Sequence, residues 1–125
     1  MSRPDRRQRA ETRGRQAETK AALLLRAKGF AILSRRYRTP VGEIDLVAGR
    51  GQLVVFVEVK WRSTIDAGLE SIHPTAQARI ARAADHWLSR HPKFANYNTR
   101  FDVVALAPWR WPVHLKQAFD TPDPF

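Results

Sequence analysis

The 125-residue sequence contains no cysteine and no uninterrupted hydrophobic run longer than five residues. Without cysteine the chain cannot form disulfides, use a thiol nucleophile or hold zinc or an iron–sulfur cluster through thiolates. The run at residues 53–57 is far shorter than the roughly 20 apolar residues that span a bilayer. The basic N-terminus also lacks the hydrophobic segment of a secretory signal. We therefore expect a cytoplasmic protein without a membrane partner.

Acidic residues are scarce, since 12 Asp and Glu stand against 22 Lys and Arg and the formal net charge is +10. Residues 1–40 alone hold 12 of the basic side chains and three of the acids. A field of one sign attracts a polyanion, and neutralised phosphates release counterions, so nucleic acid is the expected partner. The alternatives are an anionic membrane surface, disfavoured because the arginine-rich start has no aromatic or leucine face, and a solvated tail that only confers solubility. The candidate nucleic-acid contacts are Arg13, Arg15, Arg35, Arg36, Arg38 and Arg62.

Hydrophobic periodicity and turn residues indicate one α/β domain. Helical spacing predicts a helix over residues 14–28, and Pro74 begins a second helix that ends before His91. Strands are predicted over residues 30–37, 43–48, 53–61, 100–106 and 113–115, with a loop over 66–73. A crossover through the second helix makes the third and fourth strands parallel. We expect a mixed β-sheet with flanking helices and an α-β-β-β-α-β core.

The length allows a single domain. We place it at residues 14–119. A basic and flexible arm precedes it at residues 1–13, and a short tail follows at residues 120–125.

Three ionisable residues interrupt the two apolar strands that should form a hairpin. Pairing of these strands can bring Asp45 close to Glu58, with Lys60 one step along the same face, because residues two apart in a strand share a face. Two adjacent carboxylates are costly to bury unless a cation lies between them. A Mg²⁺ ion would satisfy the pair and supply the charge neutralisation that phosphodiester hydrolysis needs. The alternative is a solvent-facing ion pair with a separate hairpin charge.

The residues around this trio, GEIDLVA at 42–48 and FVEVK at 56–60, resemble the signature of the YraN-type (UPF0102) family. That family belongs to the restriction-endonuclease-like PD-(D/E)XK nuclease superfamily and is similar to archaeal Holliday-junction resolvases. The resemblance covers roughly residues 14–119 and implies a restriction-endonuclease-like fold. It also implies a metal-dependent endonuclease that acts on branched or otherwise structured DNA with Mg²⁺ or Mn²⁺. Its catalytic residues would be Asp45, Glu58 and Lys60, with Glu18 as a third metal-binding carboxylate.

The sequence departs from the family pattern at Ala17, where glycine usually precedes Glu18, and at Ala76, where a basic residue usually opens the second helix. Gln77 follows that position and could support the site, although an exposed helical glutamine is more often simply solvated. Glu43 shares a face with Asp45 and is equally well explained by a plain salt bridge.

These departures leave two further functions open. One is a nucleic-acid-binding module with a vestigial nuclease site, and the other is a basic accessory protein that binds RNA or another protein. A homodimer that presents two sites to a paired-strand substrate is a further expectation.

The aromatic residues give a weaker signal. Trp109 and Trp111 flank Arg110, an interleaving that is typical of base-stacking platforms. Two aromatic residues at i and i+2 are also typical of one face of a strand that covers the core, which is the interpretation we favour. Trp61 and Trp87 are expected in the core.

Overall fold

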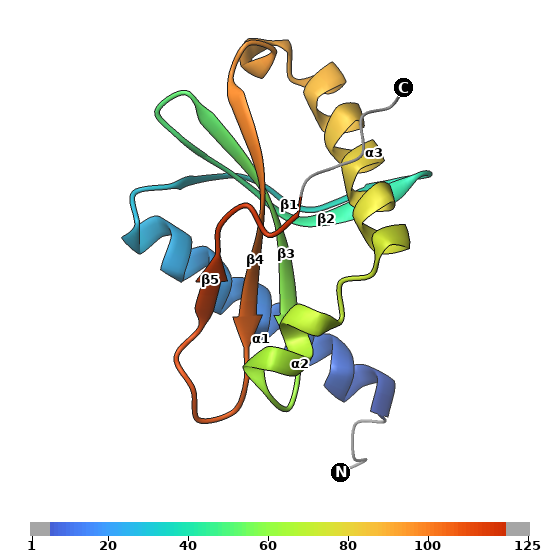
Figure 1. The fold of residues 1–125 in the computed structure, drawn as a ribbon, viewed down its shortest axis with the longest axis vertical. Coiled ribbons are helices and arrows are strands. Elements are labelled where there is room, and N and C mark those ends of the chain that lie inside the picture. Colours follow the sequence, from blue (N-terminus) through green and yellow to red (C-terminus); the bar gives the residue numbers. More distant parts are fainter. Residues whose placement is uncertain (1–5, 120–125) are drawn as a thin grey trace.

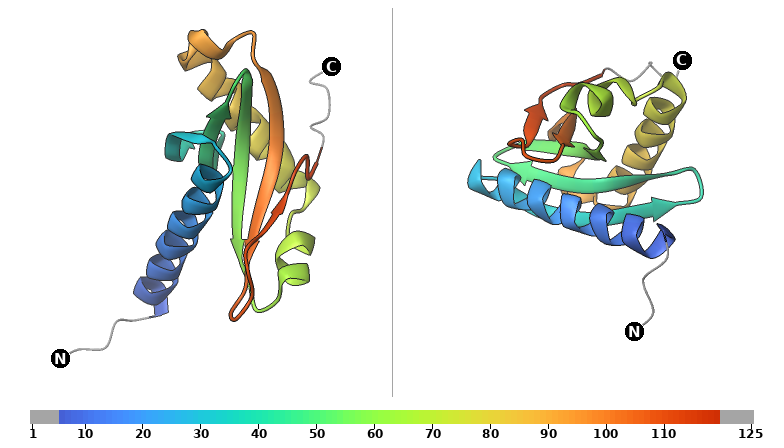
Figure 2. Two further views of the ribbon diagram at one scale, coloured as in Figure 1. Left: turned by 90° about the vertical axis from the view of Figure 1, so that its left-hand side faces the viewer. Right: turned by 90° about the horizontal axis from the view of Figure 1, so that it is seen from below.

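The structure is a computed structural model, and it describes residues 6–119. Its five strands form one mixed sheet in the order β1-β2-β3-β4-β5. Helix α1 covers one face of this sheet, and α2 and α3 lie on the other (Figures 1 and 2). The elements are α1 (Arg6–Ala27), β1 (Ala31–Thr39), β2 (Gly42–Arg50), β3 (Leu53–Trp61), α2 (Ile65–Glu70), α3 (Pro74–Arg90), the 3₁₀ turn η1 (Pro92–Phe94), β4 (Asn98–Leu106) and β5 (Val113–Leu115).

The central strand β3 is apolar on both faces because each face packs against a helical layer. Val55 and Val57 belong to the core cluster beneath α1. Val54 and Phe56 belong to the second cluster, with α3. β3 pairs with β2 in antiparallel fashion and with β4 in parallel fashion, and the other neighbouring pairs are antiparallel. The predicted α/β class, the α-β-β-β-α-β order and the parallel pair are confirmed.

Two helical segments differ from the sequence prediction. α1 begins at Arg6 rather than at residue 14, so residues 6–13 of the predicted arm are helical. These residues are Arg, Gln, Ala, Glu and Thr, mostly good helix formers that show no hydrophobic periodicity. The predicted loop at 66–73 contains most of α2, whose N-cap Thr64 accepts a hydrogen bond of 3.1 Å from the Ala67 backbone N–H. A helix of six residues is too short to show a period.

The structure describes only part of the two predicted chain ends. Residues 1–5 of the predicted arm and the predicted tail at 120–125 lie outside the described residues. Within residues 6–119, no helix combines the length and apolar character needed to cross a bilayer.

The interpretation of Trp109 and Trp111 as a core-covering strand is wrong. Both residues lie in the loop between β4 and β5, and their side chains are 101% and 90% exposed. Trp87 is fully buried as predicted. Trp61, at the end of β3, is only partly buried.

Candidate active site

The candidate site lies where β2 separates from β3. The ladder between these strands ends at the Leu46–Val57 pair, although β2 stays paired with β1 as far as Gly42. Asp45 is the first residue of β2 beyond that ladder. Its Oδ2 accepts a hydrogen bond of 2.8 Å from the Val59 backbone N–H. The carboxylate thus satisfies a backbone donor that the departing strand leaves without a backbone partner.

Glu58 and Lys60 extend this cluster along β3. The carboxyl groups of Glu58 and Asp45 lie close enough to influence each other's pKa. On its other side, Oε1 of Glu58 lies 3.4 Å from Nζ of Lys60, and these two side chains are 17% and 18% exposed. The structure therefore brings together Asp45, Glu58 and Lys60, the three side chains that the predicted strand pairing places close to each other.

Burial dominates the electrostatics of the two carboxyl groups. Burial and the neighbouring Asp45 charge raise the pKa of Glu58 from 4.5 to about 8, against the opposing effect of Lys60. Burial also raises the pKa of Asp45, although the hydrogen bond from Val59 opposes it. Two such groups hold a proton between them at neutral pH. A divalent cation could replace that proton, because it neutralises both carboxylates at once.

Both carboxyl groups line a cavity of about 380 Å³ between the sheet and α1. Three small residues of α1 form part of its wall at helical spacing, namely Ala10, Gly14 and Ala17. Their short side chains leave the carboxylates accessible beneath the helix.

Glu18 reaches the same cavity from α1, but it is engaged by Arg36. The Arg36 Nε lies 2.6 Å from Oε2 of Glu18. Arg36 stands opposite Asp45 in the β1–β2 pairing and has a left-handed φ of 51°. Among residues 6–119, no three His, Cys, Asp or Glu side chains are arranged to hold a metal ion together. Asp45 and Glu58 are thus the part of the predicted ligand set that the structure assembles.

The candidate nucleic-acid contacts divide into two groups. Arg13 and Arg62 line the carboxylate cavity, and Arg36 borders it through Glu18. The remaining three, Arg15, Arg35 and Arg38, do not line this cavity; Arg35 donates a hydrogen bond to Thr19, and Arg38 lies 3.7 Å from Glu43.

The two predicted supporting residues lie at the margin of the site. The Glu43 side chain is 56% exposed, yet its charge contributes to the raised pKa of Asp45. Gln77 donates a hydrogen bond of 3.3 Å to the Ile72 carbonyl and does not line the cavity. Gln77 therefore holds the start of α3 rather than reaching the carboxylates.

The sequence analysis missed Trp61 as a site residue. It lines the carboxylate cavity and a second cavity beside it. Nζ of Lys20 lies 5.2 Å from the centroid of its ring. One sequence feature indicates a site position for Trp61. It lies between Lys60 and Arg62 at the end of a strand, where a fully buried tryptophan is unexpected.

The raised pKa of Glu58 predicts a pH-dependent stability difference in the metal-free protein. In the unfolded chain Glu58 ionises near pH 4.5, whereas in the folded protein it ionises near pH 8. The wild type therefore loses stability as the pH rises through this window, and Glu58→Gln does not. We expect the variant's relative stability to rise between about pH 5 and pH 8.5, by an amount on the order of 1–3 kcal/mol.

Urea unfolding at a series of pH values, with chelator present, measures this difference. Glu70→Gln is the matched control, because it makes the same change at an exposed position. A stability difference between Glu58→Gln and wild type that stays constant across the pH range would contradict the buried carboxyl pair.

Comparison with known proteins places this site within a family. The model of the uncharacterised protein family UPF0102 matches residues 17–106, which include Glu18, Asp45, Glu58 and Lys60. A UPF0102 protein of Chelativorans sp. is 51% identical over 90% of this chain and 91% of its own length. UPF0102 proteins of Mesorhizobium japonicum and Sinorhizobium fredii are 52% and 51% identical, over 90% and 94% of this chain and 90% and 97% of their own lengths. The chain therefore belongs to the UPF0102 family.

Proposed function

We propose that the protein is a metal-dependent endonuclease that hydrolyses phosphodiester bonds in DNA, with branched or otherwise structured DNA as its substrate. The observation that carries the proposal is the buried Asp45–Glu58 carboxyl pair with Nζ of Lys60 at 3.4 Å from Glu58. Membership of the restriction-endonuclease-like superfamily is part of the proposal. The α-β-β-β-α-β order supports it, because the β2–β3 hairpin within that order brings the three residues together.

The side chains fit a hard divalent cation, Mg²⁺ or Mn²⁺. Asp45 and Glu58 offer carboxylate oxygens, which such ions prefer, and the raised pKa values mark a pair whose charge Lys60 compensates only in part. When bound, the ion would lower the pKa of a water molecule and neutralise charge on the phosphate. Glu18 could join the two carboxylates only after Arg36 releases it.

The basic residues have separate roles in this proposal. Lys60 is mostly buried, so its ammonium group acts with little screening by water. It would orient the attacking water or stabilise the charge that develops on the phosphate. Arg13 and Arg62 line the same cavity and would hold the flanking phosphates, which fixes the strand without reading its sequence.

The second candidate function is a nucleic-acid-binding module without cleavage, with DNA or RNA as its partner. The Glu18–Arg36 ion pair of 2.6 Å favours it, because it withdraws a carboxylate from the cavity. Against it stands the Asp45–Glu58 pair, since buried carboxylates repel phosphate and serve no purpose in a simple phosphate-binding surface.

Cleavage of a panel of labelled substrates distinguishes the two functions. The panel holds duplex, single-stranded, flap and four-way-junction DNA together with an RNA hairpin, each with Mg²⁺, Mn²⁺ or chelator. We expect at least one structured DNA to be cut with either metal and none with chelator. Tight, salt-sensitive binding without cutting of any substrate would instead identify the binding module.

A further inference from the structure

The loop between β4 and β5 presents two tryptophans that the described residues 6–119 leave almost fully exposed. Trp109 is fully exposed and Trp111 nearly so. Large aromatic side chains are normally at least partly buried, and a group of exposed ones marks an interaction surface. Leu23 of α1 is also more than half exposed and lines the same cavity as the two tryptophans.

The loop is built to hold the tryptophans outward. Pro108 and Pro112 bracket the segment and restrict its backbone. Trp109 has a left-handed φ of 64°, which is unusual for a bulky residue and is found mainly where function requires it. The Arg110 N–H donates a hydrogen bond of 3.4 Å to the Ala107 carbonyl. Both indoles are exposed at this turn.

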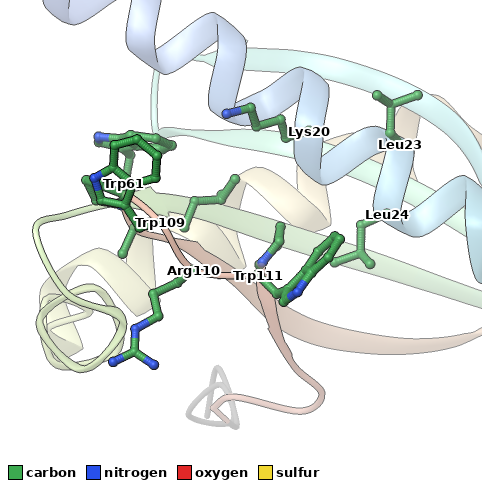
Figure 3. Close-up of a pocket in the computed structure, with 11 residues that line it drawn as sticks. Lys20, Leu23, Leu24, Trp61, Trp109, Arg110 and Trp111 are labelled. Carbon is green, nitrogen blue, oxygen red and sulfur yellow. The ribbon is translucent and has the colours of Figure 1, made fainter.

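The indoles border a cavity of about 640 Å³ between α1 and the loop (Figure 3). Its wall is mainly aromatic and aliphatic, and its charged residues, Lys20 and Arg110, are both basic. Figure 3 shows Trp111 turned toward Leu24 of α1, whereas Arg110 points away from the cavity. A surface with aromatic faces, two cations and no acidic side chain complements a stacked base with its phosphates.

The position of this cavity relates it to the candidate active site. Trp61 lines both cavities, so the aromatic surface continues up to the wall shared with Asp45 and Glu58. A strand whose bases lie along the tryptophans would therefore have its backbone near the carboxylates.

We propose that Trp61, Trp109 and Trp111 form a stacking surface for the unpaired bases of a nucleic-acid strand beside the Asp45–Glu58 site. The inference rests on the proposed function, because it takes nucleic acid as the partner. It adds to that function the class of substrate that the site accepts. Stacking tolerates every base, so the surface selects an unpaired strand rather than a sequence. The substrate it fits is DNA with a junction between paired and unpaired strands.

Binding measured without metal tests the surface apart from cleavage. Fluorescence anisotropy compares a labelled oligothymidylate with a blunt duplex of the same length, in chelator. The double variant Trp109→Ala/Trp111→Ala is expected to bind the single strand at least about tenfold more weakly, because stacking on both rings is lost. Its affinity for the duplex is expected to change by less than about twofold, since phosphate contacts dominate there.

Two further variants keep the test informative. Trp109→Phe/Trp111→Phe retains aromatic faces and should keep most of the single-strand affinity. Val41→Ala removes an exposed apolar side chain from the β1–β2 turn and should leave both affinities unchanged. All substitutions lie at exposed positions, so thermal melting should show the wild-type transition.

Several results would overturn the stacking surface. Unchanged single-strand affinity in the double alanine variant, or equal loss for both DNAs, would exclude it. If the double alanine variant lost binding to phosphatidylglycerol vesicles but not to DNA, the loop would be assigned to a membrane surface. If the wild type were a dimer and this variant a monomer, the loop would be assigned to self-association. A protein that cuts no DNA but loses single-strand binding in the variant would retain this inference and exclude the endonuclease.

Discussion

Replacing Glu58 by glutamine is expected to lower the rate of metal-dependent DNA cleavage by about a thousandfold or more, with DNA binding in chelator unchanged. Glutamine has nearly the same shape but no negative charge, so the carboxyl pair with Asp45 loses its capacity to hold a divalent cation. Glu70→Gln is the matched control, because it makes the same change at an exposed position outside the site. Single-turnover cleavage of the preferred substrate measures both variants.

Lys60→Met separates the two parts of the site. An ammonium group cannot be a metal ligand, so this variant should lose cleavage by a similar factor and still bind Mn²⁺. If Glu58→Gln cut DNA at a rate within a few fold of wild type, the carboxyl pair would not be the catalytic centre. Loss of cleavage in Glu70→Gln to the same extent would point to a general effect of charge.

Asp102→Asn is expected to cause the largest loss of stability, about 3–5 kcal/mol in the free energy of unfolding. Asp102 on β4 is fully buried. It pairs with Arg100 through two hydrogen bonds of 2.8 Å. It also accepts hydrogen bonds from His114 Nε2 at 2.7 Å and from the Gln117 backbone N–H at 3.0 Å. A neutral amide cannot accept all of these bonds, so buried donors are left without partners.

The two hydrogen bonds of the His114 imidazole, one to Asp102 and one to Lys28, indicate which ring nitrogen carries the proton. Nζ of Lys28 lies 2.9 Å from His114 Nδ1. Because an ammonium group only donates, Nδ1 accepts and Nε2 carries the proton that is donated to Asp102. Asp102 thereby links the end of α1 to β5, the strand that follows the tryptophan loop.

Asp102 also predicts how stability changes in acid. Burial alone would raise its pKa, but the hydrogen bonds from His114, Arg100 and Gln117 outweigh burial and lower the pKa to about 2. The stabilisation is therefore complete above pH 3.8, the ordinary value, and is lost as the pH falls toward 2. Urea unfolding of wild type and Asp102→Asn should show their difference shrinking in this window. Asp85→Asn is an exposed control, and a loss for Asp102→Asn no larger than this control's would contradict the network.

The elements that the sequence predicted well are those with a clear hydrophobic or proline signal. β3 has the predicted bounds because its apolar run ends in turn residues on one side and in Arg62 on the other. α3 begins at Pro74 and ends at Arg90, as proline at the first helical position and the apolar face predict. The start of α1 was missed because its first residues are mostly polar, so their helix leaves no periodic hydrophobic pattern.

The residues of the site were predictable from the sequence, but their hydrogen-bond and ion-pair partners were not. Strand alternation brings Asp45, Glu58 and Lys60 together, but no pattern reveals that β2 leaves β3 beyond Leu46 and that Asp45 then bonds to Val59. The Arg36–Glu18 pair depends on a left-handed residue that is not glycine, which sequence rules disfavour.

The tryptophan loop carried a signal that we underweighted. Pro108 and Pro112 flank it, and two prolines so close together disfavour a strand that covers the core. The exposed positions of Trp109 and Trp111 are consistent with that signal.

Calorimetric titration of Mn²⁺ into the metal-free protein tests the central claim, that Asp45 and Glu58 form a metal-binding pair, most directly. The account predicts a saturable site that is lost in Asp45→Asn/Glu58→Gln and retained in the exposed control Glu70→Gln. It also predicts that binding near pH 7 releases a proton, detected by repeating the titration in buffers of different ionisation enthalpy, because the metal replaces the proton between the carboxyl groups. No binding at millimolar Mn²⁺, or equal binding by the double variant, would contradict the account.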